Sequence, residues 1–191
     1  FFYFSTLVSL TSREMDAADL DVSLEPLHYK RLEQLRILNA AVLPVRFPNS
    51  FYDDCVKSSS DSTVLAHLDD LLVGAVATRV EKASKSEGEG EQGARLYIGS
   101  VCVLAPYRNR GIGGKLIAKC LAAAEAWGDE NIKDAYLHVQ TSNEEAVKFY
   151  EKYGFVKQRV IENYYKRIDP PHAVLMVRPF VYPPSTPSIQ V

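Results

Sequence analysis

The sequence predicts a single α/β domain. Strand-like and helix-like segments alternate along the chain, and no internal repeat or linker divides it. Its 191 residues, 47% hydrophobic and 24% charged, are ordinary for one globular domain with a sizeable core. A glycine-rich turn joins one strand-like run to a long amphipathic helix, an arrangement suited to binding phosphate.

Residues 1–23 are expected to form an N-terminal extension. Its apolar start, 1–10, is too short to span a bilayer as a helix, and no Lys or Arg precedes it as in a secretory signal. Met15 is followed by an ordinary acidic stretch and is the expected working start. Residues 1–14 are then either an artefactual extension or a truncated targeting segment.

In the first half of the domain, apolar residues at near-helical spacing predict a helix over 26–41, which stops before Pro44. A short second helix is expected over 50–58. Strands are predicted over 63–68 and 71–81, joined by a tight turn at Asp69 and Asp70. The segment 85–93, rich in Gly, Ser, Glu and Gln, is expected to be a flexible hairpin tip.

In the second half, strands are predicted over 95–104, 134–140, 155–161 and 173–178. Helices are predicted over 112–127 and 144–153. Ser142 and Glu145 have the spacing of a capping box at the start of the second of these helices, and Gly154 suits its end. The proline-rich segment 179–191 is expected to be a mobile tail.

The glycine-rich turn before residue 112 predicts a phosphate site. The start of a helix offers unpaired N–H groups and the positive end of the helix dipole. Gly111 and Gly113 let the backbone approach an anion closely, and Arg108, Arg110 and Lys115 add positive charge. The spacing matches neither the nucleotide-binding nor the dinucleotide-binding glycine motif. The alternative is a basic turn whose glycines serve only the bend.

Two motifs resemble the GNAT superfamily of N-acetyltransferases. The R-x-x-G-x-G pattern of 108–113 is similar to the superfamily's acetyl-CoA pyrophosphate loop, and 143–155 matches its N-x-x-A-x-x-F-Y-x-x-x-G-F segment. The runs 105–108, 136–140 and 163–168 further resemble NatE-type catalytic subunits, which acetylate protein N-termini. The resemblance spans about residues 24–178.

The resemblance implies a GNAT domain over 24–178, followed by the tail. Its fold would be a mixed, mostly antiparallel central sheet that splays apart between two strands and is flanked by about four helices. Acetyl-CoA is the implied cosubstrate, held partly by backbone donors in 99–103, where Gly99 fits a bulge or a close ligand approach. The implied ligands are Val101, Val103, Arg108, Asn109, Arg110, Gly111, Ile112, Gly113, Gly114, Lys115, Asn143 and Tyr150.

The implied catalytic residues are Tyr97, His138 and Tyr150. A protonated α-amine cannot attack, so a base must remove its proton directly or through water. By resemblance, Tyr97 and His138 hold the water that acts as this base, and Tyr150 protonates the departing thiolate of CoA. Packing roles remain the alternatives: a core histidine for His138 and core aromatic side chains for both tyrosines. Asn143 would cap its helix or bind the pantetheine arm.

Two loops are implied to select the substrate. Leu43, Pro44, Val45 and Phe47 match the family's F-P-V-x-Y loop around the first residue of the peptide, and Tyr164, Tyr165 and Ile168 match the loop that closes from the other side. The chain departs from the pattern in two places, because Leu43 replaces a phenylalanine and Phe47 a tyrosine. Phe47 therefore lacks one hydroxyl donor. Alternatively, these two side chains only pack the first helix.

The leading hypothesis is an N-terminal acetyltransferase for peptides that start with Met before an apolar residue. The alternatives are a GNAT enzyme for another amine, such as a lysine side chain or a polyamine, and a non-catalytic acetyl-CoA-binding subunit of a ribosome-associated complex. A NatA-type complex is a candidate partner. The net charge of −2 gives no reason to expect nucleic acid, and the His and Cys spacings favour no metal. Three single cysteines suggest reduced thiols and a cytoplasmic protein, with the nucleus as a second location.

Overall fold

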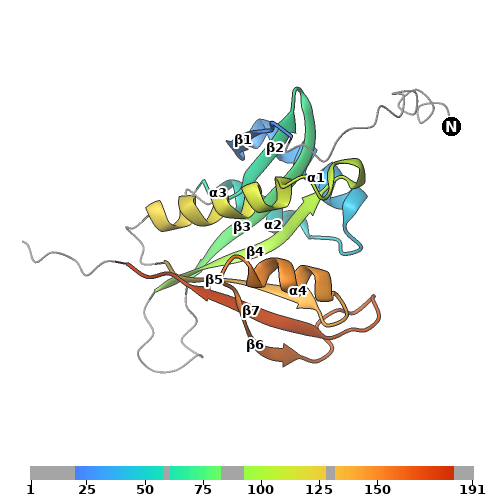
Figure 1. Cartoon of the computed structure of the whole chain (residues 1–191), viewed down its shortest axis with the longest axis vertical. Coiled ribbons are helices and arrows are strands. Elements are labelled where there is room, and N and C mark those ends of the chain that lie inside the picture. Colours follow the sequence, from blue (N-terminus) through green and yellow to red (C-terminus); the bar gives the residue numbers. More distant parts are fainter. Residues whose placement is uncertain (1–19, 58–60, 83–92, 128–131, 183–191) are drawn as a thin grey trace, which may run out of the picture.

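The computed structural model describes residues 20–57, 61–82, 93–127 and 132–182, which form a seven-stranded sheet and four α-helices (Figure 1). The strands are β1 (Ser23–Pro26), β2 (Val64–Leu68), β3 (Leu71–Lys82), β4 (Ala94–Val103), β5 (Ile132–Gln140), β6 (Val156–Ile161) and β7 (Ala173–Pro179). The α-helices are α1 (Leu32–Val42), α2 (Asn49–Lys57), α3 (Ile112–Ala126) and α4 (Glu144–Glu151). Two short 3-10 helices, η1 (Tyr29–Arg31) and η3 (Ala105–Tyr107), precede α1 and α3.

The sheet has the order β1-β2-β3-β4-β5-β7-β6, and β4 and β5 are its only parallel neighbours among the described strands. Their ladder ends at the pair Tyr97–Tyr136. Beyond it, β4 continues to Val103 and β5 to Gln140, and the two strands diverge (Figure 1). The predicted mixed, mostly antiparallel sheet, splayed between two strands and flanked by about four helices, is confirmed.

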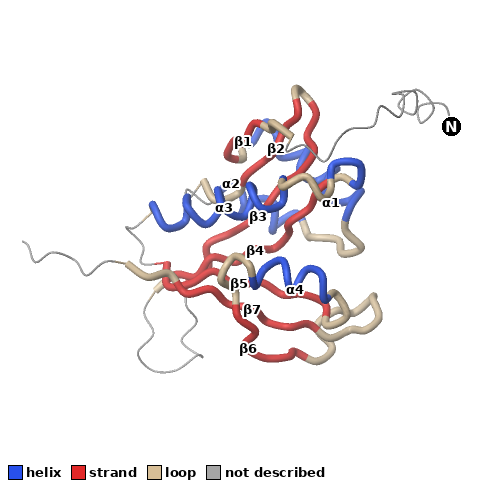
Figure 2. Tube along the Cα trace, viewed as in Figure 1, coloured by secondary structure: helices blue, strands red, loops and turns tan. Residues whose placement is uncertain are grey.

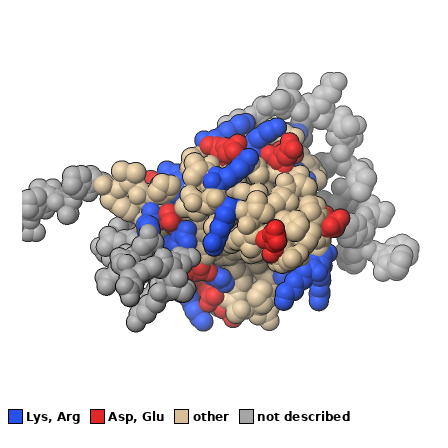
Figure 3. Space-filling model, turned by 90° about the horizontal axis from the view of Figure 1, so that it is seen from below, with Lys and Arg blue, Asp and Glu red and all other residues tan. Residues whose placement is uncertain are grey.

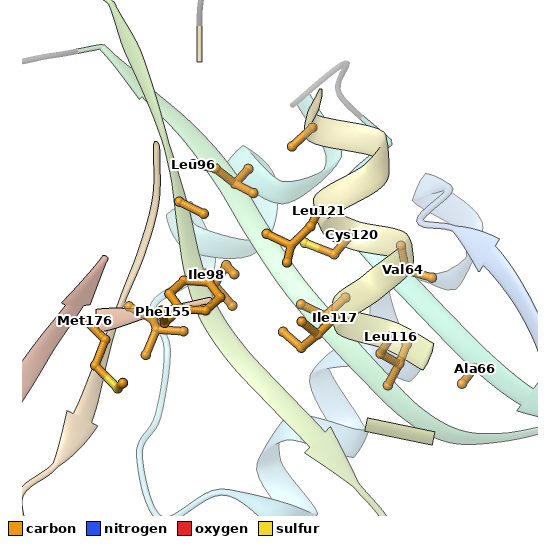
Figure 4. Packing of buried hydrophobic residues seen from close by; sticks show 14 of the residues in the cluster. Val64, Ala66, Leu96, Ile98, Leu116, Ile117, Cys120, Leu121, Phe155 and Met176 are labelled. Carbon is orange, nitrogen blue, oxygen red and sulfur yellow. The ribbon is translucent and has the colours of Figure 1, made fainter. Parts of the chain in front are cut away.

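The helices pack on opposite faces of the sheet and enclose two cores (Figure 2). The larger core lies beneath α3 and α4. In it Ile117 and Leu121 of α3 lie on the side of Leu96 and Ile98 of β4, and Leu116 lies on the side of Ala66 of β2 (Figure 4). The smaller core lies beneath α1 and α2 and contains nine buried residues: Leu35, Leu38, Phe51, Tyr52, Cys55, Leu65, Ala75, Ala77 and Cys102. Alternate residues of the central strands therefore serve different cores, as the pleat of a strand requires.

A β-bulge at Gly99 reverses this alternation in the middle of β4. Ala77 pairs with Ser100 and Thr78 with Ile98, so Gly99 has no partner in the register with β3. A Cβ at Gly99 would lie 2.5 Å from the ring of Phe51, so only glycine fits there without displacing that ring. Before the bulge the even-numbered side chains face α3, and after it Val101 and Val103 do. The predicted bulge is confirmed.

Two local predictions were wrong. The first helix was expected over 26–41, but Pro26 belongs to β1, an edge strand where proline is tolerated, and α1 begins at Leu32. The capping box was also misplaced: Asn143 caps α4, its Oδ1 accepting a hydrogen bond from the N–H of Ala146 at 3.0 Å. Of the two roles considered for Asn143, capping is confirmed.

The other predicted helices and strands lie within two residues of the observed bounds. At the C-terminal end, β7 passes the expected domain boundary by one residue, and the N–H of Phe180 donates to the carbonyl oxygen of Lys133 at 2.9 Å. Residues 1–14, most of the expected hairpin tip and residues 183–191 lie outside the described residues. The three cysteines are free and buried, as predicted. None of the described helices combines the length and apolar character needed to cross a membrane.

Candidate active site

The predicted phosphate loop lies where β4 passes through η3 into α3. Gly111 is the N-cap of α3 with a φ of 75°, a left-handed conformation that glycine adopts without strain, and no side chain caps this helix. The N–H of Lys115 donates to the carbonyl oxygen of Gly111 at 3.0 Å, which leaves the first-turn N–H groups ahead of it without intrahelical acceptors. Asn109 also has a positive φ, of 60°. The geometry is that of an anion site at a helix start.

The basic side chains of this loop also contact the protein. Nε of Arg108 donates to the carbonyl oxygen of Val103, the last residue of β4, at 3.0 Å. Nζ of Lys115 donates to the carbonyl oxygen of Leu20, also at 3.0 Å. Arg110 is half-buried at the turn itself. Arg108 thus joins the loop to the free end of β4, beside the opening between β4 and β5.

The second and third glycines of the loop face α4. A Cβ at Gly113 would meet the ring of Phe149 at 3.5 Å, an ordinary contact, whereas a Cβ at Gly114 would collide with the hydroxyl of Tyr153. Close approach of an anion was the reason expected for Gly113. Helix packing supplies an independent reason for Gly114, and neither side-chain contact was visible in the motif. Ile112 is fully buried beside them and anchors the helix start in the larger core.

Three aromatic side chains meet where β4 and β5 diverge. The hydroxyl of Tyr164 lies 3.2 Å from Nδ1 of His138 and 3.5 Å from the hydroxyl of Tyr97. The rings of His138 and Tyr164 are stacked, with centroids 4.3 Å apart and an interplanar angle of 18°. Tyr165 donates from its hydroxyl to the carbonyl oxygen of His138 at 3.4 Å. The structure therefore brings together both predicted base-site residues and two of the predicted substrate residues.

Burial sets the protonation of this cluster. It lowers the pKa of His138 to about 4, although the nearby carboxylate of Glu81 opposes the shift. Burial, with the neighbouring Tyr164, raises the pKa of Tyr97 above its usual value. The pKa of Tyr165 is raised to about 12, chiefly by burial. At neutral pH the imidazole is therefore uncharged and able to accept a proton, and the phenols of Tyr97 and Tyr165 keep theirs.

A charged network flanks the cluster and was not predicted. The hydroxyl of Tyr136 donates to Glu81, which also binds Arg79 at 2.6 Å. The guanidinium of Arg79 lies 5.0 Å from the ring centroid of Tyr97. The guanidinium of Arg95 lies 4.4 Å from the ring centroid of Tyr136. The one sequence signal was the alternation of Tyr136 with His138 on β5, because residues two apart share a face of a strand.

Tyr150, the third predicted catalytic residue, lies in the second turn of α4. Its ring packs against Phe149 and Phe155, at centroid distances of 5.2 and 5.7 Å. Burial raises its pKa, and smaller contributions come from Cys102 of β4 and from Tyr165. Tyr150 is therefore close to both the β4 strand and the substrate loop, and its phenol stays protonated at neutral pH.

The two predicted substrate loops flank the cluster. Phe47 stacks on Phe51 at a centroid distance of 4.4 Å, and Phe51 lies against Gly99, next to Tyr97. Leu43 and Phe47 also pack on the smaller core, so the packing role considered for them is real. Pro44 is exposed, whereas Val45 and Ile168 are half-buried. Tyr164 and Tyr165 cover the other side, in the loop between β6 and β7.

Comparison with known proteins gives three findings. The model of the acetyltransferase (GNAT) family matches residues 30–155. N-alpha-acetyltransferase 50 of Danio rerio is 38% identical over 157 residues, which cover 82% of this chain and 88% of that protein. The probable N-acetyltransferase san of Drosophila melanogaster is 38% identical over 74% of this chain and 72% of its own.

Among solved structures, Naa50 of Arabidopsis thaliana in complex with the bisubstrate analogue CoA-Ac-MVNAL superimposes with a TM-score of 0.72. It is 40% identical, and the match covers 84% of this chain and 100% of that one. Ard1 of Thermoplasma volcanium, at 23% identity and a TM-score of 0.68, shares the fold. Within the described residues no group of three or more His, Cys, Asp or Glu side chains could hold a metal ion.

Proposed function

The chain belongs to the acetyltransferase (GNAT) family, and from this membership we propose that it acetylates the free α-amines of peptides that begin with Met and an apolar residue, using acetyl-CoA. The observation that carries the proposal is the cluster of Tyr97, His138 and Tyr164 at the divergence of β4 and β5. An amine held there would lie next to the strand edge that the sheet leaves without a partner.

Acetyl-CoA fits the features around this opening. Its pyrophosphate would bind the N–H groups at the start of α3, with Arg108 and Arg110 beside them. The pantetheine arm would run along the free edge of β4, over Val101 and Val103, toward Asn143 and Tyr150. The left-handed Gly111 and Asn109 turn the backbone so that this path begins at the helix start.

His138 and Tyr97 would remove the proton from the α-amine. The uncharged imidazole and the phenol hold a water that accepts the proton, and the amine nitrogen then attacks the acetyl carbonyl carbon. Backbone N–H groups of 99–103 stabilise the oxyanion. As the C–S bond breaks, Tyr150 donates its proton to the leaving thiolate. Its raised pKa keeps that proton available at neutral pH. The second proton of the amine nitrogen leaves through the same water, and Tyr150 regains a proton from solvent.

The two flanking loops would read the peptide. Leu43, Val45 and Phe47 offer an apolar pocket for the first side chain, and Tyr164 and Tyr165 provide hydroxyl groups for the peptide backbone. The Arabidopsis Naa50 structure, with its analogue CoA-Ac-MVNAL, supports a Met followed by an apolar residue. Arg46, Lys166 and Arg167 are exposed near these loops and disfavour multiply charged polyamines.

For the cellular setting we propose the cytoplasm, with peptide or protein N-termini as the main partner and a NatA-type complex on the ribosome as a second one. Three free, buried cysteines are compatible with a reducing compartment. On the face seen in Figure 3, Lys and Arg side chains lie among Asp and Glu, so this face is not the uniformly basic surface that favours nucleic acid.

A peptide panel tests the preference. The protein is incubated with acetyl-CoA and peptides starting with Met-Leu, Met-Ala, Ser or an acidic residue, together with spermidine and an α-blocked lysine peptide. We expect Met-Leu to react best, by about ten- to a hundredfold over Ser or acidic starts, because burying the thioether side chain contributes roughly 1.5–3 kcal/mol. Spermidine or the blocked peptide reacting faster than every free N-terminus would contradict the proposal.

A further inference from the structure

Asn39 is a buried polar residue in the apolar face of α1. Only 1% of it is exposed. Its Oδ1 accepts hydrogen bonds from Oγ of Ser100 and from Sγ of Cys102, each at 3.2 Å. Its Nδ2 lies 3.5 Å from the hydroxyl of Tyr52 in α2. A buried amide is costly unless it is hydrogen-bonded, and these three partners satisfy it.

Two of these partners face Asn39 only because of the bulge at Gly99. Without the extra residue in β4, Ser100 and Cys102 would point to the α3 side of the sheet. Both belong to the part of β4 that lies beyond the divergence from β5. The proposed function assigns this same stretch to the acetyl group and its oxyanion.

Asn39 also lies where the first substrate loop begins. Its carbonyl oxygen accepts a hydrogen bond from the N–H of Leu43 at 2.9 Å, which ends α1. On the other side of the loop, the ring of Tyr52 meets the ring of Phe47 edge-on at 6.3 Å. The side chain and the backbone carbonyl of Asn39 therefore connect β4 with both ends of the segment 43–47, which is the proposed pocket for the first side chain of the peptide.

We infer that Asn39 is a positioning residue, which fixes the pocket for the peptide's first side chain relative to the acetyl group on β4. This inference rests on the proposed function and adds Asn39 to the residues that determine its substrate specificity. Small displacements between reacting groups lower rates steeply, so the link matters most for substrates that fill the pocket. A substrate that places no large side chain there gains little from it.

The test compares wild type with Asn39→Leu, which keeps the size of the side chain and removes its hydrogen bonds. We expect kcat/KM for a Met-Leu peptide to fall about tenfold, whereas that for a Ser-start peptide changes less than about twofold. The rise in melting temperature caused by acetyl-CoA should persist, because the start of α3 is untouched. Val22→Ala, which opens a small cavity in the other core, is the matched control for lost stability and should leave the peptide ratio unchanged.

A second variant covers the case in which Asn39→Leu does not fold. Ser100→Ala removes one of the two donors to Oδ1 and should lower the Met-Leu to Ser ratio by about threefold. A lower melting temperature with an unchanged ratio, in either variant, would overturn the positioning role and leave a structural one. A wild-type protein that acetylates no free α-amine would instead overturn the proposed function, and this inference with it.

Discussion

His138 shows how a side chain at the end of a sheet ladder can remain uncharged at neutral pH. It lies beyond the last β4–β5 pair, under the stacked ring of Tyr164, where burial lowers its pKa to about 4. Glu81 acts on His138 from a network in which it accepts from the Tyr136 hydroxyl and binds Arg79, whose guanidinium contacts the ring of Tyr97. The imidazole can therefore accept a proton without first losing one.

This protonation state gives a prediction for the rate. His138→Ala and Tyr97→Phe should each lower turnover by about a hundredfold or more, because each removes part of the site that accepts the amine's proton. In the wild type, kcat/KM should rise with pH toward the ionisation of the α-amine, near about 8, with no separate step near 6.5. Steady-state rates across a pH series measure both effects.

The control is acetyl-CoA binding, followed as a shift in melting temperature. Neither substitution touches the start of α3, so both variants should keep the shift. Wild-type rates in both variants would remove the two residues from the base site. A step near 6.5 in the wild-type profile would show that His138 titrates as a solvent-exposed histidine does, against its lowered pKa.

The motifs were enough to place the residues that carry the proposed chemistry, and they could not place the residues that support it. Tyr97, His138 and Tyr150 follow from matched patterns. The link from Asn39 to Ser100 depends on a bulge that reverses the facing of β4, and the link from Tyr136 to Glu81 joins strands that are not neighbours. Neither is encoded in a local spacing.

Among the elements, α3 shows how one glycine run serves two purposes. Gly111 adopts a left-handed conformation that caps the helix, whereas Gly114 leaves room for the hydroxyl of Tyr153 in the turn after α4. The sequence predicted the first purpose from the turn. The second could not be predicted, because Tyr153 is far from Gly114 in the sequence and no local pattern encodes their contact.

Gly113 and Gly114 should therefore respond differently to an added methyl group. Gly113→Ala should leave the free energy of unfolding unchanged or raise it by about 0.5–1 kcal/mol, since alanine favours a helix and its contact with Phe149 is ordinary. Gly114→Ala should lower it by about 1–3 kcal/mol, because the added Cβ overlaps Tyr153. Urea unfolding without acetyl-CoA measures both.

Tyr153→Phe is the matched rescue. It removes the overlapping hydroxyl, after which the nearest ring atom lies 3.3 Å from the added Cβ, so the double variant should recover most of the loss. Additive losses in Gly114→Ala and Tyr153→Phe would show that the overlap is absent and that α3 and α4 pack differently.

The boundaries of long helices and strands were predicted well. Those of the short edge strand β1 and the cap of α4 were predicted less well. The strand β1 has four residues and includes Pro26, so its apolar positions could be counted into the helix that follows. The cap of α4 was assigned to Ser142 by spacing, and Asn143 provides it, because Asn and Ser favour the same position and spacing alone does not separate them.

At the scale of the whole molecule, the opening between β4 and β5 joins the features on both faces. The glycine-rich loop and Tyr150 come from the α3 and α4 side, and the segment 43–47 comes from the α1 and α2 side. Alternating patterns predicted an α/β domain, but the mixed sheet and its divergence came only from the resemblance to the GNAT superfamily, and the strand order was not predicted. Strand pairing depends on contacts far apart in sequence, which periodicity does not encode.

We propose above all that the residues at this opening transfer acetyl groups to α-amines. The most direct test of this proposal is one peptide that begins with a free Met-Leu and also contains an internal lysine, incubated with acetyl-CoA and analysed by tandem mass spectrometry. Gly111→Glu is the control, because its side chain and negative charge would occupy the expected phosphate position and strain a residue with a φ of 75°. The wild type should acetylate the α-nitrogen and leave the lysine largely free, and Gly111→Glu should give little product. Acetylation mainly on the lysine, or an equal yield of product from Gly111→Glu, would contradict this proposal.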